Sequence, residues 1–375
     1  MKIALLCDDT LDSTDGVQQY VITLGGWLTS QGHEVHYLTS TSERTDLPNI
    51  HTLSKRVSTQ FNSNHGGMPL PAPRKHIKAL LEHEQFDIIH IQMPYSPLLA
   101  GRVIQLAPKS TKIIGTFHIF PQSKLVAAAT RALGVVVRRQ LPKFSHILSV
   151  SKAAQDFAKT AFKIDTQVIP NMVDISRFSV PVSTINNARP IQIVFLGRLV
   201  ERKGSIYLLQ AITELRKKKL HNTFEVIIAG KGPLLSTLQE YVHKHGLADI
   251  VSFPGFISED NKPAFLAHAD IAVFPSTGGE SFGISLIEAM AATPGPVLAG
   301  DNPGYRTVME GGEAQLVQPT DTAAFADTLA RYVDSQEARN AAHLWQLQHV
   351  KQYNTPVVAS QITAVYKDAL QVNTK

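Results

Sequence analysis

The sequence predicts an α/β protein built from two successive doubly wound parallel sheets. Apolar runs of strand length alternate with amphipathic helical patterns along the whole chain. The runs are continuously apolar rather than alternating, which is typical of strands covered by helices on both faces. The pattern stops at a polar segment and then starts again, and 375 residues are enough for two domains.

The first series of elements lies before Asp174. Amphipathic helices are predicted over 18–31 and 74–83, and a loop over 8–16 joins the first strand to the first helix. The strand candidates, rich in Ile, Val and Phe, are KIALLC, EVHYLTS, FDIIHIQ, KIIGTFH, HILSVS and TQVIPN.

The second series follows a join near 174–190, where VDISRFSVPVSTINNARP has polar residues and prolines but no periodicity. Helices again separate its strands. The strand candidates are IQIVFLGRL, FEVIIAGKG, IVSFPGF, IAVFPS and GPVLAGD.

Composition excludes several classes of protein. One cysteine, Cys7, allows neither an internal disulfide nor a cysteine-based zinc cluster. No apolar run approaches the roughly 18 residues of a membrane-spanning helix. The first apolar run has five residues, fewer than a signal peptide needs, so we expect a cytoplasmic protein.

The charge is unevenly distributed. Up to Val180 there are 19 Lys and Arg against 13 Asp and Glu, a balance of +6. The remainder has 17 against 18, a balance of −1. This asymmetry indicates that the first domain faces an anionic partner.

Two cations follow the first strand of the second domain. Arg198 comes directly after IQIVFLG, and Lys203 follows within a short turn. The carboxyl ends of parallel strands are where such sheets bind ligands, and a guanidinium with an ammonium suits a diphosphate. Gly230 in GKGP could let backbone approach the same ligand, although a plain turn explains it as well. An isolated pair of cations is otherwise a solvated surface feature.

The segment GGESFGISLIEAMAA is the most specific signal. Glu280 precedes, and Glu288 lies within, a helix predicted to begin near Gly283. The amides at that helix start would point towards a bound anion, and the two carboxylates could accept hydrogen bonds from sugar hydroxyls.

The first domain offers two weaker candidates. His118 ends the strand KIIGTFH and could hydrogen-bond a substrate or transfer a proton, although a lone histidine is often structural. Gly16 lies where the first loop meets a helix, a place where backbone can approach a phosphate. No Asp-x-Asp or HExxH motif occurs, so we expect no metal at a nucleotide diphosphate.

A basic amphipathic helix is predicted over 124–143. Lys124, Arg131 and Arg138 recur every seven residues, and Arg139 lies beside them. Such a helix can lie on an anionic membrane surface, and a packed helix with a solvated charged face fits the pattern equally well.

Taken together, these motifs resemble the family 4 retaining glycosyltransferases, and most closely their phosphatidylinositol mannosyltransferase branch. The resemblance runs nearly end to end. It is carried by GGESFGISLIEAMAA, Arg198 with Lys203, GKGP, IPNMVD, GVQ at 16–18, FDIIHIQMP, TFH at 116–118 and PVVASQITAVY. It implies the GT-B architecture, in which two Rossmann-like domains face a cleft and the last helix returns to the first domain. The domains would be 1–172 with 355–375, facing acceptor and membrane, and 173–354, binding the donor.

The resemblance also implies an activity: metal-independent transfer of a hexose from a nucleotide sugar with retention at the anomeric carbon. The donor would be GDP-mannose and the acceptor a phosphatidylinositol-like lipid at the cytoplasmic membrane face, with no cofactor and no nucleic acid. His118, Arg198, Lys203 and Glu280 would serve catalysis, and Gln18 with the basic helix would face the acceptor and membrane. The residues implied to bind the donor are Gly16, Arg198, Lys203, Gly230, Glu280, Phe282, Gly283, Ile284 and Glu288.

Departures from the family pattern keep other functions open. Asp8-Asp9 stands where the mannosyltransferases carry Pro-Tyr, and Asp15 precedes Gly16. Acids near the acceptor suit an anionic phosphoinositide poorly, which favours diacylglycerol as a rival acceptor. A UDP-sugar donor with a soluble or polysaccharide acceptor is a second alternative, and a non-catalytic nucleotide-binding protein is a third.

Overall fold

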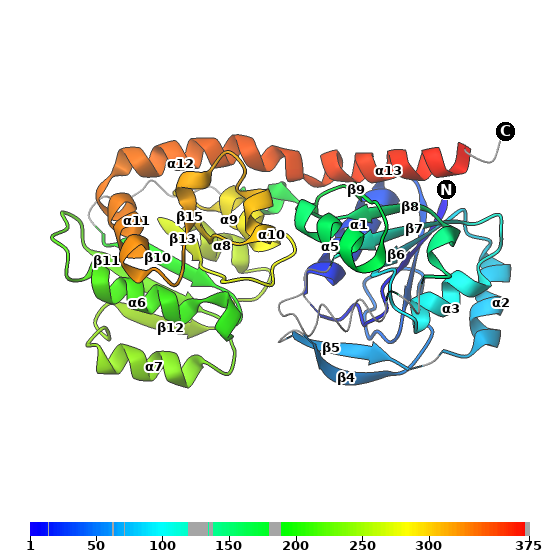
Figure 1. Cartoon of the computed structure of the whole chain (residues 1–375), viewed down its shortest axis with the longest axis horizontal. Coiled ribbons are helices and arrows are strands. Elements are labelled where there is room, and N and C mark those ends of the chain that lie inside the picture. Colours follow the sequence, from blue (N-terminus) through cyan, green and yellow to red (C-terminus); the bar gives the residue numbers. More distant parts are fainter. Residues whose placement is uncertain are drawn as a thin grey trace. The chain divides into compact units, whose positions relative to one another are not determined.

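The computed structural model describes residues 1–13, 15–61, 64–70, 72–118, 134, 138–179 and 189–371, with backbone only over 56–69. The chain divides into two compact units. One unit combines Met1–Met172 with Tyr353–Lys375, and the other is Val173–Gln352. Figure 1 labels most of their helices and strands.

The first unit contains a parallel sheet of seven strands in the order β3-β2-β1-β6-β7-β8-β9. The strand order changes direction between β1 and β6, which makes their carboxyl ends a topological switch point. Its strands are β1 (Lys2–Leu6), β2 (Glu34–Thr39), β3 (Ile50–Thr52), β6 (Ile88–Gln92), β7 (Lys112–Phe117), β8 (Phe144–Ser149) and β9 (Gln167–Val168).

Helices cover both faces of this sheet, as the continuously apolar strands predict. Ile3 and Leu5 of β1 face a core shared with α1 and α13, whereas Ala4 and Leu6 face a core shared with α2 and α3. The C-terminal helix α13 packs on α1 and across β7 and β8 (Figure 1). The helices are α1 (Gly16–Ser30), α2 (Arg74–Glu84), α3 (Leu99–Leu106), α5 (Lys152–Phe162) and α13 (Thr355–Gln371), with a 3-10 turn η1 (Leu141–Lys143).

The second unit contains a parallel sheet of six strands in the order β12-β11-β10-β13-β14-β15. Alternate strand residues such as Ile193 and Phe195 face a core shared with α6 and α11. The strands are β10 (Ile191–Leu196), β11 (Phe224–Ala229), β12 (Val251–Gly255), β13 (Ile271–Phe274), β14 (Val297–Gly300) and β15 (Leu316–Val317). The helices are α6 (Ser205–Leu215), α7 (Leu235–Lys244), α8 (Lys262–Ala267), α9 (Ile284–Ala292), α10 (Pro303–Val308), α11 (Thr322–Asp334) and α12 (Gln336–His349), with 3-10 turns η2 (Ile175–Phe178), η3 (Glu201–Lys203), η4 (Glu313–Gln315) and η5 (Val350–Tyr353).

The prediction of two doubly wound parallel sheets is therefore confirmed, but it omitted several strands. Strands β3 and β15 are short, and β4 (Arg56–Phe61) pairs with β5 (Asn64–Pro69) as an antiparallel hairpin outside the main sheet. The hairpin sequence contains Asn, His and two Gly in place of an apolar run, so strand-length hydrophobicity does not reveal it.

A series of buried side-chain hydrogen bonds connects the C-terminal helix to the first sheet. The ring of His90, in β6, has no exposed surface. Its Nδ1 lies 2.6 Å from the hydroxyl of Tyr366 in α13, and its Nε2 lies 2.7 Å from the hydroxyl of Thr116 in β7. Both ring nitrogens are thus satisfied in the interior, where an unpaired polar group would be costly.

This histidine should make the fold sensitive to acid. Burial lowers the pKa of His90 from 6.5 to about 3, so below pH 6.5 the unfolded chain binds a proton that the native state excludes. Its stabilising effect is therefore complete above pH 6.5 and is lost as pH falls towards 3. At pH 5 the loss is about 2 kcal/mol in the free energy of unfolding.

Thermal unfolding of the wild type and of His90→Gln between pH 5 and 7.5 tests this expectation. The variant should be less stable at pH 7.5 and should lose less stability on acidification, by about 2 kcal/mol at pH 5. Burial also lowers the pKa of His118, but that group is common to both proteins and cancels in the comparison. If the stabilities of the two proteins fell in parallel as the pH is lowered, the proposed role of His90 in acid sensitivity would be contradicted.

Candidate active site

The second sheet delivers a basic turn at its carboxyl edge. Strand β10 ends at Leu196, and Arg198 and the turn η3 follow. Gly204 ends this turn with φ of +74°, and a Cβ there would lie 1.9 Å from the carbonyl oxygen of Pro275. Only glycine allows this close approach, which brings η3 against the loop after β13.

Glu280 lies in that loop, and its carboxylate contacts cationic side chains of the basic turn. Its Oε1 lies 2.9 Å from Lys203 Nζ, 2.5 Å from Arg202 Nη1 and 3.0 Å from the Ser276 hydroxyl. The Glu280 side chain is 13% exposed. The sequence motifs predict that Lys203 and Glu280 serve the same ligand, and the structure brings these two side chains together. The motifs do not predict the contact of Arg202.

Electrostatics set the charges of this cluster. Burial by itself would raise the pKa of Glu280, but Lys203 and Arg202 hold that pKa below its usual value, so the carboxyl is ionised. Burial lowers the pKa of Lys203; Glu280 opposes this effect, and Arg202 and Arg198 add to it. The site therefore places one carboxylate among three cationic side chains.

Helix α9 begins directly after this loop, as the sequence predicts. Gly283 is its N-cap residue and Ile284 its first residue, while the ring of Phe282 is buried beneath. The first amides of a helix have no partner within it and form a positive end. The site thus combines a helix N-terminus with the side chains around Glu280.

Glu288, the second predicted acid, is a buried carboxylate inside α9. Both of its oxygens lie 3.2 Å from Nζ of Lys262, the first residue of α8. Burial raises the pKa of Glu288, although Lys262 opposes this shift. The sequence does not predict the role of Lys262, because this residue is 26 positions from Glu288 and belongs to no motif.

Gly230 has a structural role besides any ligand contact. Its φ is +145°, and a Cβ at this position would lie 1.8 Å from the carbonyl oxygen of Gly197. The glycine therefore allows the loop after β11 to pack against the loop after β10. Beside it, Lys231 Nζ lies 5.3 Å from the ring centre of Phe256, an exposed aromatic that follows β12.

His118 follows β7 at the carboxyl edge of the first sheet. Its Nε2 lies 2.7 Å from Gln92 Oε1, and its ring meets that of Tyr20 edge-on at 4.9 Å. Because the amide oxygen only accepts, Nε2 carries the proton and Nδ1 keeps a lone pair. Burial lowers the pKa of His118 to about 3, so the ring is neutral and can exchange hydrogen bonds with a ligand.

In the loop after β1, polar side chains lie differently from what the sequence suggests. Gly16 begins α1, and Gln18 is buried with its Nε2 donating to the Thr10 carbonyl at 3.2 Å. The Asp8 carboxylate accepts from the Ala100 amide at 2.7 Å and from the Ser96 hydroxyl, and burial raises its pKa to about 6. Asp8 therefore holds the start of α3 and does not present its charge at the surface.

The basic segment over 124–143 is described in part. Lys124 and Arg131 lie outside the described residues. Arg138 and Arg139 are exposed in a turn, and η1 follows it, so the predicted α-helix is wrong at this end. Pro142 explains the difference, because proline cannot donate the backbone hydrogen bond of a continuing α-helix. Among the described residues, no helix has the length and hydropathy needed to cross a membrane.

Two family models match most of the chain. The model described as Glycosyltransferase Family 4 matches residues 14–177, and the model described as Glycosyl transferases group 1 matches residues 180–343. These matches cover the first-sheet candidates and the cluster around Glu280, respectively.

Curated relatives match over their full length. The phosphatidyl-myo-inositol mannosyltransferase of Mycobacterium tuberculosis H37Rv is 30% identical over 376 residues, covering 98% of this chain and 97% of the relative. The protein of the same name from Mycolicibacterium smegmatis is 30% identical over 372 residues, covering 98% and 94%.

Solved structures match at the level of the fold. The Anabaena protein Alr3699/HepE in complex with UDP has a TM-score of 0.76 at 19% identity, covering 98% of this chain and 100% of that one. The sucrose-phosphate synthase of Thermosynechococcus elongatus has a TM-score of 0.75 at 20% identity, covering all of both chains. With the sequence matches, these likenesses place the chain in the glycosyltransferase family 4, with the GT-B fold and in the phosphatidylinositol mannosyltransferase branch.

Proposed function

We propose that this glycosyltransferase moves mannose from GDP-mannose onto a phosphatidylinositol-like lipid, as a peripheral protein on the cytoplasmic face of the plasma membrane. The observation that carries the proposal is Glu280, ionised and held between Lys203 and Arg202 beside the start of α9. An acceptor for sugar hydroxyls and donors for a diphosphate thus occur together. The names of the relatives supply the sugar and the acceptor class.

The donor would bind along the carboxyl edge of the second sheet. Arg198, Lys203 and the amides of 282–284 would hold the diphosphate, because cations and a helix N-terminus both favour anions. Glu280 would accept hydrogen bonds from the sugar, and Glu288, held by Lys262, from the ribose. Gly16 and Gly230 would allow backbone to approach the donor.

Catalysis would rest on stabilising the departing diphosphate. Glu280, which accepts from the Ser276 hydroxyl, fixes the side chains of Lys203 and Arg202 before the reaction, so they need not reorganise as negative charge develops. We assign no side chain as general base: the leaving phosphate would take the acceptor's proton on the same face, which retains the anomeric configuration. His118, neutral, would hydrogen-bond near the reacting sugar. No metal is required at the diphosphate in this mechanism.

The positive charge of the first part of the chain supports an anionic membrane and acceptor. The part of the chain up to Val180 has a balance of +6, and Arg138 and Arg139 are exposed. Each such cation near an anionic membrane adds about 1 kcal/mol to binding. Of the two acids that favoured a neutral acceptor, Asp8 is turned inward, which weakens that argument against a phosphoinositide. A UDP-sugar donor is the second candidate, because the Anabaena neighbour binds UDP and glucose.

Ligand-dependent melting separates the donors. Purified protein is heated with GDP, UDP or ADP in chelator-treated buffer, and a ligand that binds only the native state raises the melting temperature. We expect a shift with GDP. A shift with UDP alone would replace GDP-mannose by a UDP-sugar, and no shift with any nucleotide would remove the donor assignment.

Transfer is then measured from labelled GDP-mannose to vesicles. Vesicles of phosphatidylcholine alone, with phosphatidylinositol, or with diacylglycerol distinguish the acceptors. Label in the phosphatidylinositol lipid alone supports the proposal, and label in diacylglycerol contradicts the acceptor. Nucleotide binding without transfer to any acceptor would favour a non-catalytic protein.

A further inference from the structure

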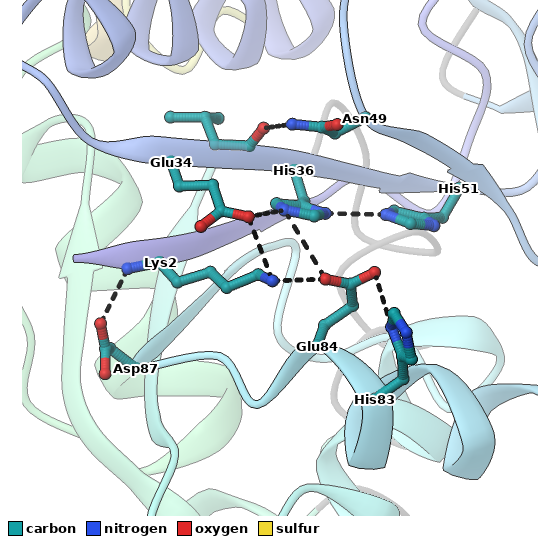
Figure 2. A network of polar contacts seen from close by, with 9 residues as sticks. Lys2, Glu34, His36, Asn49, His51, His83, Glu84 and Asp87 are labelled. Carbon is teal, nitrogen blue, oxygen red and sulfur yellow. Dashed lines mark hydrogen bonds and ion pairs between the residues drawn. The ribbon is translucent and has the colours of Figure 1, made fainter.

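A second cluster of ionisable side chains lies at the amino-terminal side of the first sheet (Figure 2). His36 belongs to β2, His51 to the edge strand β3, and Glu84 ends α2. Lys2 and Glu34, the first residues of β1 and β2, complete it. His118 instead follows the carboxyl end of β7, so this cluster takes no part in the proposed transfer.

The two histidines face each other through ring nitrogens. His36 Nδ1 and His51 Nε2 are 2.8 Å apart, and the two ring planes are within 3° of parallel (Figure 2). Two lone pairs at this distance repel unless a proton or a cation lies between them. At this distance the pair shares one proton, and a bound ion would take the place of that proton.

His36 is oriented as metal-binding histidines are. Its other nitrogen, Nε2, lies 3.0 Å from Glu34 Oε1, and its ring is buried edge-on against Phe86 at 5.2 Å. A carboxylate that accepts from one ring nitrogen fixes the tautomer and leaves the lone pair of the other nitrogen free for a metal. Nδ1 of His36 is thus aimed at His51 by its surroundings.

A carboxylate completes a three-ligand set. One ligand atom each from His36, His51 and Glu84 lie within 4.8 Å of one another. Glu84 Oε2 lies 3.9 Å from His36 Nε2, so the Glu84 carboxylate would have to turn towards the Nδ1 side to share an ion with His51. Two nitrogens of a tetrahedral zinc site are about 3.3 Å apart, so the His36–His51 pair would open by about 0.5 Å. His51 can accommodate this shift because β3 is a short edge strand.

We propose that His36, His51 and Glu84 bind a divalent transition-metal ion of the zinc class, with water as a fourth ligand. Two imidazoles and one carboxylate are a donor set that suits Zn²⁺. The ion would join β2, β3 and the end of α2. It would therefore link the two ends of the segment between positions 51 and 84. Its role is to stabilise the first unit, and it is independent of the proposed donor site.

Lys2 is the internal competitor for this position. Its Nζ lies 2.5 Å from Glu84 Oε2 and 3.1 Å from Glu34 Oε1, so an ammonium already contacts both carboxylates. A metal at Glu84 must displace it. Lys2→Met should therefore tighten metal binding, whereas a cluster that holds only protons and Lys2 would gain no affinity from this substitution.

The test uses the full chain, free of any affinity tag and stripped of metal. Zn²⁺ is titrated in competition with a chromophoric chelator, and Co²⁺ is added separately to record the absorption of a tetrahedral site. We expect one equivalent of Zn²⁺ to bind. Glu34→Gln should weaken binding about 10- to 100-fold, and loss of a ligand in His51→Gln should weaken it by at least about 100-fold.

His146→Gln is the matched control. His146 in β8 also lies near a carboxylate, at 3.1 Å from Asp368 Oδ2, but it belongs to no three-ligand set among the described residues. This variant should bind Zn²⁺ as the wild type does. Absence of a stoichiometric site, or equal affinities of the wild type and His51→Gln, would overturn the proposal.

Stability provides an independent readout. Excess Zn²⁺ should raise the melting temperature of the wild type and of His146→Gln, because the ion binds the native state. His51→Gln, whose circular dichroism should match that of the wild type, should show no such rise. An equal rise in all three proteins would indicate binding elsewhere and contradict the site.

Discussion

Replacing Glu280 by glutamine should lower the rate of sugar transfer about 100- to 1,000-fold, the range seen when one preorganised polar group is removed from an active site. Glu280 fixes Lys203 and Arg202 by contacts of 2.9 Å and 2.5 Å, and the proposed mechanism also uses its carboxylate for the sugar hydroxyls. Glutamine keeps the shape and can still accept from Ser276. It removes the charge that holds the two cations in place.

The expected kinetic pattern distinguishes this role from a purely structural one. kcat should fall more than the affinity for nucleotide, because the phosphates retain Lys203 and Arg198. Glu201→Gln is the control: Glu201 is an exposed acid in the same turn, η3. Circular dichroism and nucleotide-free melting should confirm that both variants fold. If Glu280→Gln or Glu280→Ala transferred sugar at the wild-type rate, the assignment of Glu280 to the active site would be contradicted.

The fold could be predicted because its sheets are covered on both faces. Strands such as β1 and β10 then become continuous apolar runs, which are visible without any tertiary information. Edge elements lack this signal. Strand β3 has three residues, and the β4–β5 hairpin lies outside the main sheet, so neither needs an apolar run.

The site was predictable where chemistry and backbone coincide in sequence. Glu280 is flanked by glycines and followed by a helix start, and Lys203 precedes a glycine at a strand end. Arg202 and Lys262 carry no such local mark. Their roles arise only when residues 78 and 26 positions apart meet, as in the Arg202–Glu280 and Lys262–Glu288 pairs.

Asp8 illustrates the opposite error. Read in sequence, Asp8-Asp9 places two acids beside the acceptor. In the fold the Asp8 carboxylate accepts from the Ala100 amide and the Ser96 hydroxyl at the start of α3. A residue's neighbours in the chain could not reveal this, because α3 begins about 90 positions later. The direction of a side chain, more than its type, decides which partner its charge can meet.

Replacing Lys203 by methionine should weaken the binding of GDP about 10- to 100-fold, the range expected when a hydrogen bond to a charged group is lost. Lys203 is held at the carboxyl edge of the second sheet by Glu280, with Arg202 and Arg198 nearby. Its ammonium is the point charge that the proposed mechanism directs at the diphosphate. Methionine retains much of the length and apolar surface of the side chain, so the second unit should remain folded.

A comparison of GDP with GMP decides whether this loss concerns the diphosphate. If Lys203 meets the terminal phosphate, Lys203→Met should weaken GDP binding more than GMP binding, and the two affinities should converge. Lys218→Met is the matched control, because Lys218 also forms an ion pair, at 2.6 Å from Asp327, but away from the sheet edge. Equal losses for GDP and GMP would mean that Lys203 acts on the base, the ribose or the fold. Since Glu280 keeps Arg202 as a partner in this variant, a selective loss for GDP would isolate the phosphate contact from the carboxylate's own role in transfer.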